Sequence, residues 1–74
     1  MIDRVPYGMR LMVNGEEQQH NEGLTVEGLV ESLGLEKSIC AVEVNKAVVP
    51  RSDRATRVLA EGDTVEVVTL VGGG

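Results

Sequence analysis

The sequence predicts an α+β domain in which one mixed sheet of four to five strands packs against a single helix. Stretches of alternating apolar and polar residues lie on both sides of one amphipathic helical segment, and an Asn-Gly dipeptide joins the first two stretches. The 74 residues form one small domain, and 42% of them are hydrophobic, which is typical of a packed globule. A core of this size leaves little room for an enclosed active site.

The first two strands are predicted as a hairpin. Apolar and polar residues alternate from Met9 to Val13, and the alternation ends at Asn14-Gly15. This dipeptide favours positive φ at both central positions of a two-residue turn. The return strand, over residues 16–20, is polar and is predicted to lie at or near an edge of the sheet.

The helix is predicted within residues 24–34. Thr25 is expected to cap it, and Gly34 suits the left-handed residue that ends a helix. Gly28 in its interior costs up to about 1 kcal/mol relative to alanine, and a close approach of helix to sheet would explain it. Helical spacing gives one apolar stripe, made by Val26, Leu29, Val30 and Leu33.

Two strands are predicted after the helix. Alternation over residues 40–44 marks a third strand, whose apolar face includes Cys40 as a small buried hydrophobe. A short strand over residues 47–49 is ended by Pro50, because proline cannot donate to a ladder.

The last part of the chain leads into a final strand. Residues 51–57 are polar and predict a turn or a single helical turn, with Val58 and Leu59 pointing inward. Residues 64–68 alternate again as the last strand. If the first and last strands are neighbours they run parallel, which needs the long connection that is present here. That arrangement is the β-grasp.

The expected organisation is an N-terminal extension over residues 1–8, a β-grasp domain over 9–68 and a tail over 69–74. The tail ends in Gly72-Gly73-Gly74. Glycine has no Cβ, so this segment is a thin, flexible thread that fits a narrow cleft. The hypothesis is that the Gly74 carboxylate is the working group.

Composition argues against several classes of function. The net charge is -5 and no block of basic residues exists, so nucleic-acid binding is not expected. No apolar run is long enough to span a bilayer, and a single cysteine fits a reducing compartment, so the expected location is the cytoplasm. His20 has no partner at metal-ligand spacing, and a lone Cys40 on the apolar face of a strand is expected to be a buried hydrophobe and not a sulfur-bearing nucleophile. No acid-base pair, triad or metal cluster is present, so neither a metal site nor independent catalysis is expected.

An ordered set of short motifs closely resembles the ThiS family, the sulfur carriers of thiamine biosynthesis. The resemblance covers residues 9–74. Its motifs are the hairpin 9–15, Thr25-Val26, Val44-Asn45, Val49-Pro50-Arg51, Glu61-Gly62-Asp63 and Val71-Gly72-Gly73-Gly74.

The resemblance implies that the chain is a co-substrate. An E1-like adenylyltransferase of the ThiF type would use ATP to adenylate the Gly74 carboxylate. Sulfur derived from a cysteine desulfurase would then convert Gly74 to a thiocarboxylate, which a thiazole synthase of the ThiG type would consume. No bound cofactor is expected.

Candidate partner-binding residues follow from the position of the tail. Leu70 and Val71 would anchor the thread, Gly72 and Gly73 would pass through the partner's channel, and exposed Met12 and Val68, on the sheet face opposite the helix, would form a small docking patch. The basic residues Lys46, Arg51, Arg54 and Arg57 form a second candidate contact. Many family members carry tryptophan where Arg54 stands, so no contact is carried over to that position.

Three alternatives share the predicted fold. The small subunit of molybdopterin synthase and ubiquitin-like modifiers also depend on activation of a C-terminal glycine. A β-grasp interaction module would use its surface alone, and its tail would be a frayed end or a linker.

Overall fold

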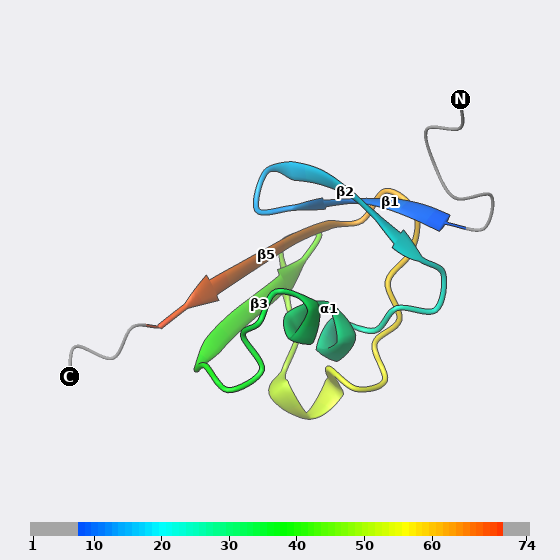
Figure 1. Cartoon of the computed structure of the whole chain (residues 1–74). Coiled ribbons are helices and arrows are strands. Elements are labelled where there is room, and N and C mark those ends of the chain that lie inside the picture. Colours follow the sequence, from blue (N-terminus) through cyan, green and yellow to red (C-terminus); the bar gives the residue numbers. More distant parts are fainter. Residues whose placement is uncertain (1–7, 71–74) are drawn as a thin grey trace.

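The computed structural model describes residues 8–70, which form a five-stranded mixed sheet and two helices (Figure 1). The strands lie in the order β2-β1-β5-β3-β4. β1 and β5 each extend one residue beyond the boundaries expected for the domain. In chain order the elements are β1 (Gly8–Val13), β2 (Glu16–Asn21), α1 (Val26–Ser32), β3 (Cys40–Val44), β4 (Ala47–Val48), the 3-10 helix η1 (Arg51–Asp53) and β5 (Thr64–Thr69).

The first and last strands are parallel neighbours, as the sequence predicts. Met12 lies opposite Thr64 and Val13 opposite Val65, whereas every other pairing in the sheet is antiparallel. Helix α1 crosses one face of this sheet (Figure 1). The predicted β-grasp fold is confirmed.

The hairpin turn has the expected positive φ values, and its residue Asn14 also bonds to β5. Asn14 and Gly15 have φ values of 50° and 85°, and Val13 pairs with Glu16. The Asn14 amide N–H donates to the Val65 carbonyl at 2.9 Å, and its side-chain Oδ1 accepts from the Val67 N–H at 2.8 Å. The turn residue therefore continues the β1–β5 ladder after β1 itself has ended.

Helix α1 begins and ends with the predicted residues. Thr25 Oγ1 accepts a hydrogen bond from the Gly28 N–H at 3.0 Å, and Gly34 has a φ of 75°. The explanation expected for Gly28 was wrong. A Cβ at this position would lie 2.9 Å from Leu24 Cδ1, so the close neighbour is the residue before the cap and not the sheet.

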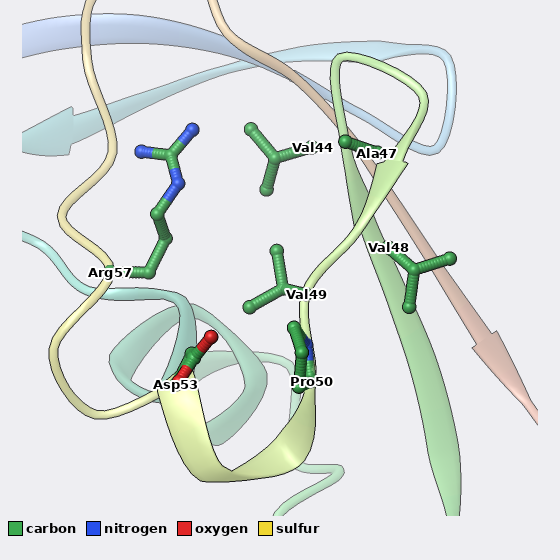
Figure 2. A pocket seen from close by; sticks show the side chains of 7 residues that line it. All are labelled: Val44, Ala47, Val48, Val49, Pro50, Asp53 and Arg57. Atoms are coloured by element: carbon green, nitrogen blue, oxygen red, sulfur yellow. The ribbon is translucent and has the colours of Figure 1, made fainter.

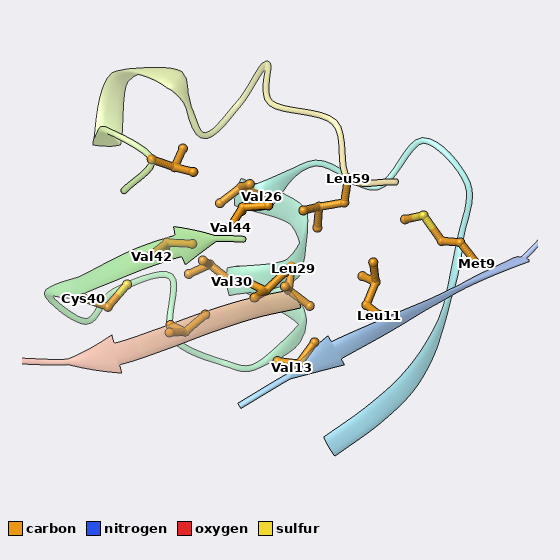
Figure 3. Packing of buried hydrophobic residues seen from close by; sticks show 13 residues of the cluster. Met9, Leu11, Val13, Val26, Leu29, Val30, Cys40, Val42, Val44 and Leu59 are labelled. Carbon is orange, nitrogen blue, oxygen red and sulfur yellow. The ribbon is translucent and has the colours of Figure 1, made fainter. Parts of the chain in front are cut away.

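The core lies between the helix and the inner face of the sheet (Figure 3). Cys40 is buried among apolar side chains, as predicted. The cluster contains Met9, Leu11, Val13, Val26, Leu29, Val30, Cys40, Val42, Val44, Val49, Leu59, Val65 and Val67.

Of the two residues expected to point inward after η1, only Leu59 does so. Its N–H donates to the Leu24 carbonyl at 2.9 Å, and its side chain is buried. Val58 forms an isolated antiparallel bridge with Thr25 and is 49% exposed. Because successive side chains in an extended segment alternate, one of these neighbours must face solvent.

A polar network joins the β3–β4 turn to the start of β5. Asp63 is buried, and its carboxylate accepts from Asn45 Nδ2 at 2.9 Å and from the Ala60 N–H at 2.8 Å. Asn45 Oδ1 in turn accepts from the Thr64 N–H at 2.9 Å. The sequence indicates turns at both places but not this contact between them.

Candidate functional site

The tail leaves the domain from the central strand of the sheet. β5 lies between β1 and β3, and its pairing with β3 runs to Thr69, opposite Cys40. The Leu70 N–H then donates to the Ile39 carbonyl at 2.8 Å, which extends the ladder by one residue. The predicted tail residues 71–74 lie outside the described residues, and residues 1–7 of the expected extension do as well.

Exposed apolar side chains lie where the tail begins. Val68 and Leu70 are 54% and 56% exposed, and Val68 lies directly opposite Ala41. Ile39, the hydrogen-bond partner of Leu70, is 65% exposed. We call the set of Ile39, Ala41, Val68 and Leu70 the tail-root patch.

Met12 shares the sheet face opposite the helix but does not join the tail-root patch. It is 37% exposed and lies opposite Thr64. Four residues of strand separate Thr64 from Val68, which corresponds to roughly 13 Å. The expected pair of Met12 and Val68 is therefore two separate exposed positions, and Val68 belongs with Leu70.

Two carboxylates lie beside the tail-root patch on the same face. Glu43 of β3 is directly opposite Glu66 of β5, one register step beyond the Val42–Val67 pair. Val48 lies opposite Glu43 on the other side and is 66% exposed. Sequence reasoning missed this pair because cross-strand register is not visible in either strand alone.

The four basic residues named as a candidate contact do not share one role. Arg54 is only 8% exposed; its Nη2 donates to the Cys40 carbonyl at 2.6 Å, and its Nη1 lies 3.6 Å from Cys40 Sγ. The exposed side chain of Arg57 donates to the carbonyl of Val58 at 2.6 Å. A buried guanidinium is not available to a partner, so Arg54 is removed from the candidate contact.

Arg54 completes the edge of β3. The Leu70–Ile39 hydrogen bond fixes the alternation of the ladder, so the Cys40 carbonyl points away from β5. β4 and the residue after it cover that side of β3 only as far as the Val49 N–H, which donates to the Val42 carbonyl at 2.9 Å. The Arg54 guanidinium satisfies the next free carbonyl, at the strand that pairs with the tail root.

A shallow hollow of about 150 Å³ lies between β4 and η1 (Figure 2). Its apolar wall is flanked by the side chains of Asp53 and Arg57. Its lining extends to Val44, which lies at the opposite end of β3 from Cys40. The lining residues are Val44, Ala47, Val48, Val49, Pro50, Asp53 and Arg57.

Within residues 8–70 no group of three or more His, Cys, Asp or Glu side chains is placed to hold a metal ion. No helix in this part of the chain is long and apolar enough to cross a membrane.

Comparison with known proteins connects this arrangement to one family. The ThiS family model matches residues 8–74. The chain is 29% identical to the sulfur carrier protein ThiS of Escherichia coli K12 over 66 residues, which cover 89% of this chain and all of that protein. A crystal structure of a thiamine biosynthesis protein (ThiS) from Geobacter metallireducens matches with a TM-score of 0.76 and 32% identity, covering 89% of this chain and 100% of the other.

A longer relative contains a segment of the same kind. The chain is 41% identical over 66 residues to a thiazole synthase from Paramagnetospirillum magneticum, and the match covers 89% of this chain. It spans only 20% of the length of that relative. The family model, the full-length match to a sulfur carrier and the shared β-grasp structure agree, and the chain belongs to the ThiS family.

Proposed function

We propose that the protein is a sulfur carrier for thiamine biosynthesis, and that its working group is the carboxylate of Gly74. Membership of the ThiS family is the single observation that carries this proposal. The course of the chain supports it, because the central strand β5 leads directly toward the glycine tail.

The chemistry explains why partners are needed. A carboxylate is a poor electrophile, so it must first be activated. A carboxylate oxygen of Gly74 would attack the α-phosphorus of ATP on a ThiF-type adenylyltransferase, with release of pyrophosphate. The persulfide sulfur supplied through a cysteine desulfurase would displace AMP, and a thiol would cleave the resulting acyl disulfide to leave the thiocarboxylate. The catalytic groups belong to the partners.

A thiazole synthase of the ThiG type is the proposed acceptor of the sulfur. The support is that a segment similar to this chain makes up 20% of the thiazole synthase from Paramagnetospirillum magneticum. In this proposal the thiocarboxylate of Gly74 enters the acceptor's site and gives up its sulfur there.

The tail has the dimensions that delivery requires. An extended segment from Thr69 to Gly74 spans about 20 Å, enough to carry the terminal carboxylate into a partner's cleft. Gly72 and Gly73 would form the part that enters the narrowest region, because they have no side chain to clash. Leu70 and Val71 would contact apolar walls before it.

Intact mass spectrometry tests the proposal. The protein is incubated with the ThiF-type adenylyltransferase, ATP, cysteine desulfurase, cysteine and a thiol, and we expect the mass increase that corresponds to replacing one oxygen by sulfur. A variant lacking Gly73 and Gly74 should not be loaded, while its melting temperature stays close to that of the parent protein. The absence of exchange on the folded parent protein, with partners that are active on another ThiS, would contradict the carrier function.

A further inference from the structure

The hollow between β4 and η1 has an apolar floor with opposite charges at its two ends. Val44, Val49 and Pro50 line the floor. Figure 2 shows the Arg57 guanidinium on the side of Val44 and the Asp53 carboxylate on the side of Pro50. The volume of about 150 Å³ is below the roughly 300–1,000 Å³ of small-molecule pockets, so a short segment of chain suits the hollow better than a cofactor.

The cationic end is suited to bind a carboxylate. Arg57 is exposed, and its Nη1 donates to the Val58 carbonyl at 2.6 Å, which leaves most of the guanidinium N–H donors for another group. Within residues 8–70 neither Asp53 nor another carboxylate forms a salt bridge with Arg57. Exposed Lys46 lies in the turn that follows Val44 and adds a second positive charge at the same end.

The anionic end is suited to bind a hydrogen-bond donor. The Asp53 side chain is exposed, and its carboxylate can accept from backbone N–H groups. A segment that complements the whole hollow therefore has N–H donors, then aliphatic side chains, then a negative charge. A peptide C-terminus has this order when its last large residues are aliphatic, and capture of a terminal carboxylate is a recurring mode of peptide recognition.

The end of this chain has the same order of groups. Leu70 is 56% exposed, and it is followed in the sequence by Val71 and three glycines. The glycines have no side chain that would keep a terminal carboxylate away from Arg57. We propose that the β4–η1 hollow binds the C-terminal tail of a second copy of this chain, with the aliphatic residues on the apolar floor and the Gly74 carboxylate at Arg57.

A second copy is required because the tail of the same molecule is too short. The Leu70 N–H is bonded to the carbonyl of Ile39, which lies five residues before Val44 in the chain. That separation corresponds to about 16 Å along β3, and β4 lies two strand spacings of roughly 5 Å to the side of β5. The four residues after Leu70 extend over about 14 Å at most, so Gly74 does not reach Arg57 in its own chain.

The inference rests on the proposed function in one respect, that Gly74 carries a free carboxylate. It goes beyond that function, because a tail held by a second copy is withheld from the cleft of a partner. Self-association would therefore limit delivery of the tail at high concentrations of the protein.

Nuclear magnetic resonance of the isolated protein tests the binding site. A peptide of residues 69–74 is titrated onto the full isotope-labelled chain at low protein concentration, with the same peptide ending in a carboxamide as a control. We expect the acid peptide to shift the backbone amides around the hollow, those of residues 47–49, 53 and 57. It should bind about threefold more tightly than the carboxamide, which is the modest gain typical of an exposed ion pair.

Two arginine variants of equal charge locate the carboxylate. Arg57→Gln should bind the acid peptide about threefold more weakly than the parent protein does, with unchanged affinity for the carboxamide. Arg51→Gln is the matched control, because Arg51 is also exposed but lines a different hollow beside α1. It should bind both peptides as the parent protein does. Thermal unfolding checks that both variants are folded.

Dilution of the full chain identifies the occupant. Between about 2 mM and 0.1 mM the amides around the hollow should shift in the parent protein and shift less in Arg57→Gln. No shift with the acid peptide at about 5 mM, equal binding of the two peptides, or an equal loss in both variants overturns the inference. Peptide binding without a dilution effect also overturns it, because the occupant would then be the tail of the same molecule or the end of another protein. Neither measurement uses ATP or a partner, so these failures are distinct from a failure of sulfur loading.

Discussion

The contact between Asn45 and Asp63 is predicted to be among the most important polar interactions for stability. It holds the β3–β4 turn against the segment that starts β5, over a separation of 18 residues. We consider the replacement of Asp63 by alanine, of Asn45 by glycine, and of both together. Glycine is chosen for Asn45 because its φ is 52°, a value that glycine adopts without strain and alanine does not.

The expected losses of stability follow from the hydrogen bonds that each substitution removes. The hydrogen bond from Asn45 Nδ2 to the Asp63 carboxylate involves an ionised group and is worth about 1.5–3 kcal/mol, and the bond from the Ala60 N–H adds about 1 kcal/mol. Asp63→Ala should therefore lower the free energy of unfolding by about 2–4 kcal/mol. Asn45→Gly should cost a similar amount, because it also removes the acceptor of the Thr64 N–H.

Thermal and urea unfolding of the four proteins measure the coupling. The double variant should be more stable than the sum of the two single losses implies, by about 1.5–3 kcal/mol, because the shared hydrogen bond is lost only once. Asn45→Ala serves as a control and should be less stable than Asn45→Gly by about 1 kcal/mol. A coupling energy below about 0.5 kcal/mol would refute the role assigned to this contact.

Two further substitutions test local interactions. Thr25→Ala removes the acceptor of the Gly28 N–H and should lower the melting temperature by about 4–8 °C. Thr25→Ser keeps a hydroxyl acceptor and should retain most of the stability. Equal melting temperatures of the two variants would contradict the capping role. Arg54→Met keeps an unbranched aliphatic stem but leaves the Cys40 carbonyl without its donor, so it should cost about 1–2 kcal/mol and speed hydrogen exchange at the Leu70 N–H. Unchanged exchange there would show that Arg54 does not support the tail root.

Features encoded in neighbouring residues were predictable from the sequence. The hairpin at Asn14-Gly15 and the helix capped by Thr25 depend on backbone preferences within a few residues, and both are present. The parallel direction of β1 and β5 was predictable once the two strands were taken as neighbours, because a long connection joins them. The burial of Cys40 followed from strand alternation.

Features that depend on register or on distant contacts were not predictable. Arginine is usually a surface residue, so the burial of Arg54 was not expected. The short β4 leaves the Cys40 carbonyl free at the sheet edge, and the Arg54 side chain reaches it. The inward and outward directions of Val58 and Leu59 depend on the bridge to Thr25. The Glu43–Glu66 pair exists only once β3 and β5 are aligned.

The central position of β5 has a mechanical consequence. In the proposed function, a partner that draws the tail into its cleft would pull on β5 along the axis of the strand. The hydrogen bonds to β1 and β3 run across that axis, so the load falls on many of them at once and not on one bond after another. The side chain of Asn14 adds a further bond to Val67. The domain would therefore resist unfolding while a pulling force acts on the C-terminal end of β5.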